Sequence, residues 1–348
     1  MGSLNHPKWE FTMLYRGRNI LPLIAVLLFS AGALTGWLLG AQRLRTDLQA
    51  SRGSEIRQQG YTLINPLLEC EVAKDHDLFE ELTPFKDKVA ALLKERTVNY
   101  KLIHVSVYFR DLNSGTWFGI NEHDLFAPAS LLKVPTLIAC LKQAEQDPSF
   151  LSKRILYRGG QDLNLQQSLK PLEPLRQGAV YTVEQLLHRT IEQSDNNAHA
   201  LLFQTVDNSL LAKTYKTLGV EIPNDSTPDD FLSVKAYASF FRILFNASYL
   251  SKEMSHKALT LLAETDFKDG LVAGVPSTIA VAQKYGERIL GKHQEIKELH
   301  DCGIVYYPGH PYLLCVMSRG NDFTTLDDII RDVSRLVYEE VDLQREKR

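Results

Sequence analysis

The pattern of hydrophobic and polar positions indicates strands at both ends of the main part of the chain. Residues 102–111 alternate apolar and polar side chains, as expected of a strand with one buried face, and residues 116–120 would pair back after a turn at residues 113–115. Three further strand-like runs lie toward the C-terminus, at residues 278–283, 300–306 and 311–317. The last two flank Pro308-Gly309, which favours a hairpin.

Helical periodicity fills the region between these strands. Helices are expected at residues 130–146, 182–193, 197–206, 209–218, 228–247 and 251–264. An amphipathic helix from residue 78 to residue 93 precedes the first strand, and another from Thr325 to Glu340 closes the chain. This order predicts an α+β fold, in which an antiparallel sheet flanked by the first and last helices is joined to an all-helical lobe.

The N-terminal part differs because residues 19–42 carry no charged side chain. A helix over residues 20–41 would be about 33 Å long, enough to cross a hydrocarbon core of about 30 Å. We therefore expect one transmembrane helix at residues 20–41, preceded by a cytoplasmic tail at residues 1–19 and followed by a linker at residues 42–60. The alternative is a cleaved signal peptide after the small residues 31–33, but the apolar run continues beyond them and favours an uncleaved anchor.

Composition is consistent with a globular domain at residues 61–348. The chain is 44% hydrophobic and 23% charged, which is typical of a protein with a full core. The formal net charge of −3 gives no basis for a nucleic acid partner. The cysteine and histidine spacing matches no metal site, and we expect no metal and no cofactor.

Four cysteines leave the disulfide pattern open. Cys140 falls in an apolar helix, where a buried thiol is expected. Cys302 and Cys315 lie symmetrically about residues 308–309, so a tight turn there would bring them face to face across two strands. A disulfide between those two, or from Cys70 to one of them, would form outside the cytoplasm, and the sequence does not choose between them.

The strongest chemical signal is Ser130 followed three positions later by Lys133, where a loop runs into an apolar helix. Residues three apart on a helix are neighbours, so the hydroxyl and the ammonium would lie on adjoining faces of the first turn. The helix N-terminus adds free backbone N–H groups and a partial positive charge, which stabilise an oxyanion. Together these are the parts of an activated serine nucleophile.

Two further polar clusters follow in order. Ser194-Asp195-Asn196 comes after a helical run, and Lys284-Tyr285-Gly286 comes at the end of a strand-like run. With these three motifs, residues 80–345 resemble the penicillin-recognising serine hydrolases, most closely the class A β-lactamase-like branch. Each motif alone has a plain structural alternative, as a helix cap, a polar turn or a solvated strand end, but their joint order and spacing favour the family.

The resemblance implies a catalytic role for three residues. Ser130 would attack an amide or lactam carbonyl and form an acyl-enzyme. Lys133 would act as its base if burial and nearby positive charge keep the amine neutral. Ser194 would relay a proton to the leaving nitrogen.

The same resemblance implies five substrate-binding residues. Asn196 would hold the catalytic lysine and the substrate amide, and Lys284 would bind the substrate carboxylate in a subsite that includes Tyr285 and Gly286. The backbone N–H of Glu287 would form the oxyanion hole together with that of the nucleophile.

Two departures from the family pattern bear on mechanism. The third motif usually carries Thr where this chain has Tyr285, whose ring would either reshape the carboxylate subsite or pack on a neighbouring strand. Class A β-lactamases also carry a Glu-x-x-x-Asn segment whose Glu activates the deacylating water, and the sequence from Asn196 to Lys284 contains none. Glu221 is the only Glu near the expected position; it could substitute for the missing base, but a surface turn residue is the plainer interpretation.

The sequence therefore predicts a membrane-anchored serine hydrolase that acts on β-lactams or related amides. Without the missing Glu, deacylation loses general-base assistance worth roughly 10²–10⁴-fold, so a slow-turnover penicillin-binding D,D-peptidase acting on peptidoglycan stem peptides is the first alternative. A non-catalytic envelope sensor that keeps the fold is the second. Basic residues lie on both sides of the apolar run, so the catalytic domain is placed outside the cytoplasm because of its expected substrate and not because of these charges.

Overall fold

The structure is a computed structural model, and it describes residues 24, 28–30, 32, 34–36, 55–58, 60–70, 85–99, 102–220, 222–290 and 295–346. The predicted cytoplasmic tail lies outside these residues, as does most of the predicted anchor and linker. Within the described residues, no helix is both long and apolar enough to cross a membrane. The anchor at residues 20–41 stays a prediction.

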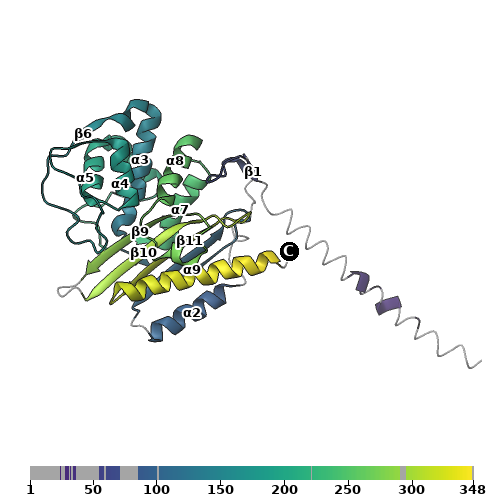
Figure 1. The fold of residues 1–348 in the computed structure, drawn as a ribbon. Coiled ribbons are helices and arrows are strands. Elements are labelled where there is room, and N and C mark those ends of the chain that lie inside the picture. Colours follow the sequence, from purple (N-terminus) through teal and green to yellow (C-terminus); the bar gives the residue numbers. More distant parts are fainter. Residues whose placement is uncertain are drawn as a thin grey trace, which may run out of the picture. The chain divides into compact units, whose positions relative to one another are not determined.

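The chain divides into two units, and the larger one, which comprises residues 56–69 and 77–348, contains a five-stranded sheet. The strands lie in the order β4-β3-β11-β10-β9, and all neighbouring pairs are antiparallel (Figure 1). They are β3 (His104–Asp111), β4 (Trp117–Ile120), β9 (Val281–Leu290), β10 (Ile296–Val305) and β11 (Tyr312–Gly320). β9 is an edge strand of this sheet, so the backbone groups along one side of it are not paired with another strand of the sheet.

Three short strand pairs lie outside the main sheet. They are β1 (Glu55–Arg57) with β2 (Leu67–Cys70), β5 (Leu125–Phe126) with β8 (Leu232–Ser233), and β6 (Arg154–Leu156) with β7 (Val180–Thr182).

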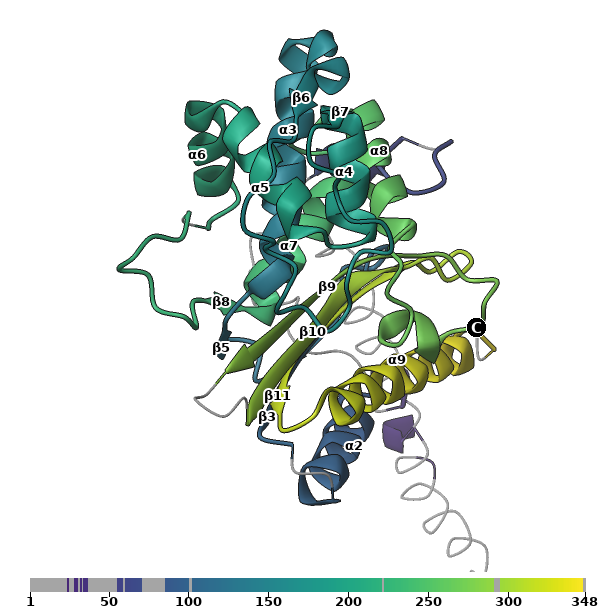
Figure 2. The same cartoon turned by 60° about the vertical axis from the view of Figure 1, so that its left-hand side comes forward.

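The described helices flank the sheet on its two faces (Figures 1 and 2). They are α2 (Lys86–Asn99), α3 (Lys133–Gln146), α4 (Val183–Glu192), α5 (Asn196–Thr205), α6 (Asn208–Thr217), α7 (Val234–Phe245), α8 (Lys252–Ala263) and α9 (Phe323–Glu346), with 3₁₀ turns η2 (Ala129–Leu132), η3 (Pro148–Ser152) and η4 (Leu271–Gly274). The predicted α+β arrangement is confirmed, because α2 and α9 cover one face and the remaining helices form a lobe on the other.

Each face of the sheet has its own hydrophobic core. Under α2 and α9, Phe85 packs edge-to-face on Phe109 and on Phe118, with ring centroids 5.1 and 5.4 Å apart. The helical lobe is built around α3, whose Leu137 and Ile138 are completely buried. These two cores fix α3 and β9, which carry the first and third motifs.

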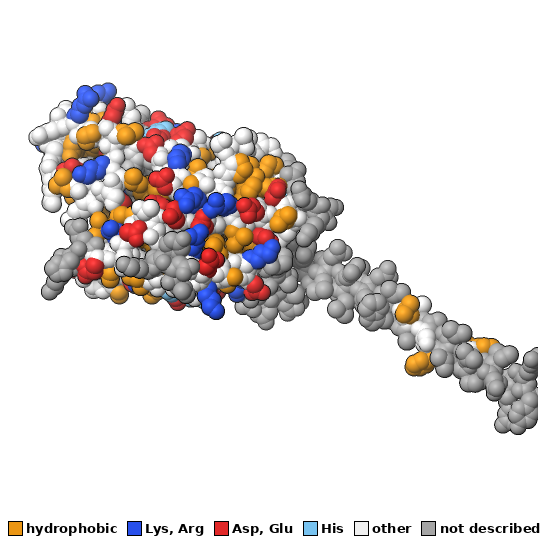
Figure 3. All heavy atoms as spheres, turned by 60° about the horizontal axis from the view of Figure 1, so that its bottom comes forward, with side chains coloured by type: hydrophobic (Ala, Val, Ile, Leu, Met, Phe, Trp, Pro, Cys, Tyr) orange, Lys and Arg blue, Asp and Glu red, His pale blue; other side chains and the backbone are white. Residues whose placement is uncertain are grey.

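Ion pairs hold the outer side of the α2 and α9 layer. Lys88 pairs with Glu340 at 2.5 Å, and Arg96 pairs with Asp332. Figure 3 shows this side of the molecule, where basic and acidic side chains are interspersed. Asp332 and Glu340 are buried, at 6% and 9% exposure, and the cost of removing these carboxylates from water offsets much of the gain from pairing, so the apolar cores remain the main source of stability.

Side-chain caps set where the lobe helices begin. Thr182 and Gln185 form a capping box at the start of α4, and Asp195 caps α5. The helix predicted at residues 228–247 is wrong at its N-terminus, because α7 begins only after Ser233, whose Oγ accepts the backbone N–H of Ala236.

Two other boundaries also differ from the sequence prediction. β9 runs from Val281 to Leu290, so the third motif lies inside the strand and not at its end. The first helix is described only from Lys86 onward, and the part predicted at residues 78–84 lies outside the described residues.

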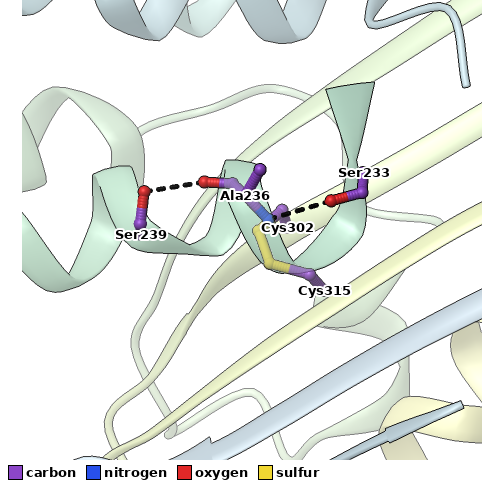
Figure 4. Close-up of a disulfide and its surroundings, with 5 residues drawn as sticks. All are labelled: Ser233, Ala236, Ser239, Cys302 and Cys315. Atoms are coloured by element: carbon purple, nitrogen blue, oxygen red, sulfur yellow. Dashed lines mark hydrogen bonds between the residues drawn. A yellow bond between two sulfur atoms is a disulfide. The ribbon is translucent and has the colours of Figure 1, made fainter. Parts of the chain in front are cut away.

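A disulfide joins Cys302 to Cys315, directly opposite each other in β10 and β11, with Cα atoms 4.0 Å apart. The hairpin prediction is confirmed, because Gly309 has a φ of +74° and the N–H of His310 donates to the carbonyl of Tyr307 across the turn. Figure 4 shows the disulfide beside the first turn of α7, near Ser233. The thiol of Cys140 is buried and free, as predicted.

Removing this disulfide should destabilise the domain. Replacing both Cys302 and Cys315 by Ala should lower the free energy of unfolding by roughly 3 kcal/mol, because the loop closed by the bond regains entropy in the unfolded chain. Urea denaturation with and without a reducing agent measures the change. Reduction should lower the free energy of unfolding of the unsubstituted protein to that of the variant and leave the variant unchanged. Equal free energies for both proteins, with and without the reducing agent, would show that the disulfide does not form.

Candidate active site

The predicted nucleophile lies on a strained turn. Ser130 belongs to η2, so the segment predicted as a helix over residues 130–146 begins with a 3₁₀ turn that leads into α3. Ala129 has a φ of +48°, which is uncommon for a residue with a Cβ atom. Strain of this kind costs about 1–3 kcal/mol and persists where the surrounding structure fixes the backbone. The turn holds Ser130, which is half-buried, beside the Lys133 side chain.

The Lys133 amine is the centre of the site. Its Nζ lies 2.9 Å from the Oγ of Ser130 and 2.9 Å from the Oγ of Ser194. It also lies 2.6 Å from the backbone carbonyl of Ser194 and 2.6 Å from the Oδ1 of Asn196. The first two motifs therefore meet at one nitrogen atom, as the sequence predicts.

The four oxygens around Lys133 are not equivalent. The carbonyl of Ser194 and the Oδ1 of Asn196 can only accept hydrogen bonds, so they take two of the amine hydrogens. The remaining position faces the two serine hydroxyls, which can also donate. A neutral Lys133 would keep its lone pair at that position and could accept the Ser130 proton.

Burial and charge both favour the neutral form of this amine. Lys133 is only 2% exposed. Burial lowers its pKa well below the ordinary value, and the Lys284 cation lowers the pKa further, while Asp195 and Glu287 act in the opposite direction. Desolvation lowers the pKa most, so burial of Lys133 in the folded protein favours the neutral amine that can act as a base.

Ser194 reaches Lys133 from a second strained turn. Its φ is +53°, and its side chain is completely buried. Asp195 stabilises this turn, because its Oδ1 accepts two backbone N–H groups from the first turn of α5. Asn196, the first residue of α5, is thereby directed at the amine.

Lys284 approaches the same serine from β9. Its Nζ lies 3.1 Å from the Oγ of Ser194 and 3.0 Å from the carbonyl of Tyr285. Burial lowers the pKa of Lys284 to about 7, against the attraction of Asp301 and Glu287. The Ser194 hydroxyl therefore lies between two amines, and it can pass a proton from one partner to another.

The Tyr285 ring lies in the core on the side of Phe267. The two rings stack with centroids 4.5 Å apart, and Tyr285 is only 3% exposed. The Lys284 Nζ lies 4.0 Å from the centre of the Tyr285 ring, a cation–π contact that stabilises the charged amine. This matches the packing alternative for the ring, and a role of Tyr285 in substrate binding stays a prediction.

Gly286 permits a close approach between β9 and the nucleophile turn. A Cβ atom at this position would lie 3.0 Å from the carbonyl oxygen of Pro128 and 3.2 Å from the backbone nitrogen of Leu131. A larger residue would therefore push the strand away. The close approach brings β9 against the turn that carries Ser130, and a role of the Glu287 backbone N–H in an oxyanion hole stays a prediction.

The sequence did not predict the contribution of residues 158–178, here called the bridging loop, which connects β6 to β7. Asn164 donates to Asp195 at 2.9 Å and accepts the backbone N–H of Asn196 at 2.7 Å. Gln167 donates to the Ser194 carbonyl at 2.8 Å. The only sequence signal here was a polar segment bounded by glycines, which indicates a loop but not its partners.

A histidine in a layer behind Lys133 was also missed. The His199 Nε2 lies 3.0 Å from the Thr136 Oγ1, one turn along α3 from the amine. Burial lowers the pKa of His199 to about 3, and Lys133 and Lys284 add to this effect, so the imidazole is neutral. No family motif covers this position.

The segment after α6 carries two acids that are paired with arginines. Asp229 lies 2.8 Å from Arg288, and Asp230 lies 2.6 Å from Arg319. Glu221 lies outside the described residues. Asp225, the other described acid of this segment, is exposed.

Among the described residues, one group has the composition of a metal site. His188, Glu192 and Glu264 bring one potential ligand atom each within 4.8 Å of the others. His188 and Glu192 already form a hydrogen bond of 2.6 Å along α4. None of the three belongs to the three motifs.

Comparison with known proteins places this geometry in a family. The family model described as "Beta-lactamase enzyme family" matches residues 84–341. A curated β-lactamase from Streptomyces albus G is 25% identical over 255 residues, which cover 68% of this chain and 79% of that protein.

Solved structures share the fold. The structure of PBP-A has a TM-score of 0.61 at 21% identity and covers 74% of this chain and 96% of its own. A class A β-lactamase from Mycobacterium abscessus has a TM-score of 0.61 at 21% identity, and the match covers 73% of this chain and 97% of that one. A β-lactamase from Sphaerobacter thermophilus has a TM-score of 0.62 at 22% identity, and the match covers 74% of this chain and 97% of that one. The chain therefore belongs to the beta-lactamase enzyme family and is a class A β-lactamase-like serine hydrolase that works through an acyl-enzyme.

Proposed function

We propose that this protein opens β-lactams or related peptide amides through an acyl-enzyme on Ser130. The observation that carries the proposal is the buried Lys133 amine 2.9 Å from the Ser130 hydroxyl. A similar structure, a mutant of PBP-A, is an acyl-enzyme complex with penicillin G, which supports a β-lactam as a ligand of this site.

Acylation would begin with transfer of the Ser130 proton to neutral Lys133. The Oγ then forms a bond to the carbonyl carbon, and the backbone N–H groups of Ser130 and Glu287 hold the oxyanion. Collapse of this intermediate breaks the C–N bond. The leaving nitrogen takes a proton from Ser194, whose hydroxyl is resupplied by the protonated Lys133 next to it.

The substrate end of the site would use the β9 residues. Lys284 would attract the substrate carboxylate when protonated, and Asn196 would hold the substrate amide once it is free of Lys133. Tyr285 would act through Lys284, because its ring contacts that amine and not open space. Gly286 would act indirectly, by letting β9 lie close to the Ser130 turn.

Deacylation is the slower half of the proposed reaction. It needs a base for the attacking water, but the carboxylates of Asp229 and Asp230 are already paired with arginines, and Asp225 is exposed to solvent and has no neighbour among the described residues that would hold it toward Ser130. This observation favours the second candidate, a slow-turnover penicillin-binding D,D-peptidase acting on peptidoglycan stem peptides. The non-catalytic sensor has less support, because it would not require a base beside Ser130.

We also propose a single-pass membrane protein with the catalytic domain outside the cytoplasm. The uncharged run at residues 19–42 supports the anchor. The disulfide between Cys302 and Cys315 supports the location, because such bonds persist mainly in oxidising compartments. Protease protection of the N-terminal tail in intact cells tests the orientation.

The protein should be labelled covalently by a fluorescent penicillin at one molecule per chain. Slow deacylation predicts a burst of chromogenic cephalosporin hydrolysis followed by a steady state at least roughly 10²-fold slower. Gel fluorescence and absorbance measure the two quantities. Replacing Ser130 by Ala should abolish both signals, whereas Ser149→Ala on the surface should change neither. Fast turnover without a burst would favour an efficient β-lactamase, and labelling that survives Ser130→Ala would exclude Ser130 as the nucleophile.

Acylation should depend on pH in a way that reflects both lysines. The rate constant should rise as Lys133 loses its proton, and it should fall above a pH of about 7 as Lys284, whose pKa is about 7, loses the charge that attracts the substrate carboxylate. In Lys284→Gln, the rising limb should move to higher pH, because removing the cation raises the pKa of Lys133. The falling limb should disappear.

Stopped-flow labelling by fluorescent penicillin across this range measures the profile. Lys213→Gln, an exposed change on α6, is the matched control and should leave both limbs in place. A rising limb that stays fixed, or that moves to lower pH, in Lys284→Gln would contradict the coupling between the two amines.

A further inference from the structure

The bridging loop has the construction of a hinged element. Its base is closed by β6 and β7 and by backbone hydrogen bonds of Tyr157 with residues 178–179. Gly159, Gly160 and Gly178 all have positive φ, at +77°, +146° and +82°. Glycines at both ends of the loop can absorb backbone rotation that other residues resist.

On one side, the loop is attached to the second motif. Asn164 and Gln167 bond the strained turn, and the backbone N–H of Leu163 donates to the Oδ1 of Asn197 at 3.0 Å. Asp162 accepts the side-chain N–H of the same Asn197 at 2.8 Å. These contacts fix the loop to the helical lobe.

On the other side, one side chain connects the loop to the sheet. The Glu287 Oε1 accepts the backbone N–H of Ser168 at 2.7 Å and that of Leu169 at 3.3 Å. In the hydrogen bonds of the described residues, this carboxylate is the only group of β9 that bonds the loop. Because β9 is the edge strand that lies against the Ser130 turn, these bonds connect the loop to the second motif at one end and to the strand of the third motif at the other. Figure 2 shows β9 at the edge of the sheet, below the helical lobe.

Apolar packing contributes little to this closed position. Leu165 is 63% exposed and Leu172 is 83% exposed, and Leu163 and Leu169 are also exposed, whereas Leu175 near the C-terminal end of the loop is buried in the core of the lobe. Moving the part of the loop from Leu163 to Leu172 would therefore sacrifice few apolar contacts. The charge-assisted bonds to Glu287 are left as the main restraint on the β9 side.

We propose that the bridging loop is a lid over Ser130 and that the Glu287 side chain is its latch. The proposal rests on the proposed function, because a lid matters only if Ser130 receives a substrate. A substrate with a bulky acyl group must break the latch before it reaches Ser130, whereas a small substrate can enter beneath the closed loop. Glu287 thus acts as a specificity-determining residue through its side chain, in addition to the backbone role proposed for its N–H group.

Amide hydrogen exchange in the full chain tests the latch without any substrate. Exchange at Ser168 and Leu169 should increase by about threefold in Glu287→Gln, which keeps a neutral acceptor, and by about tenfold in Glu287→Ala, which keeps none. Glu95→Gln, an exposed change on α2, is the matched control and should leave these amides unchanged. Exchange in both Glu287 variants equal to that of the unsubstituted protein would overturn the latch.

Acylation rates test the lid. The same variants should accelerate labelling by a fluorescent penicillin by about threefold to tenfold relative to labelling by 6-aminopenicillanic acid, which has no acyl side chain. If the Ser168 and Leu169 amides exchange faster but the ratio of the two labelling rates is unchanged, the loop is mobile but is not a lid. If the unsubstituted protein reacts with neither compound, the proposed function fails, while the exchange experiment still decides the latch.

Discussion

Burial of the Lys133 amine is the interaction on which the rest of the site depends. A lysine with 2% exposure loses most of its hydration, so the folded protein favours the neutral form. The carbonyl of Ser194 and the Oδ1 of Asn196 satisfy its hydrogens, which directs the lone pair at the Ser130 hydroxyl. Moving any of these groups would leave a buried polar atom unpaired, which costs about 1–3 kcal/mol.

This constraint explains why the site lies where two hydrophobic cores meet. The helical lobe supplies Lys133 and Ser194, and the sheet supplies Lys284, so the site exists only when both cores are packed. The same packing stabilises the left-handed backbone at Ala129 and Ser194. The disulfide between β10 and β11 then stiffens the sheet next to the strand that carries Lys284.

Much of this could be predicted from the sequence, because periodicity and motif order are local signals. Hydrophobic spacing predicted the sheet and most helices, whereas the meeting of Ser130, Lys133, Ser194 and Asn196 was implied by the resemblance of the three motifs to the family. The start of α7 was missed because a single cap at Ser233 decides it. The bridging loop was missed because its bonds to Asp195 and Glu287 join distant segments, and nothing in a polar loop indicates its partners.

Burial shifts Lys133 toward the neutral amine that can take the Ser130 proton, and a titration of this side chain tests the shift directly. An NMR titration of the Lys133 side chain, assigned by its loss in Lys133→Arg, gives the pKa without any substrate. We expect a pKa well below the ordinary lysine value of about 10.4. A pKa at or above that ordinary value would exclude Lys133 as the base, because the amine would then be charged and unable to take the Ser130 proton.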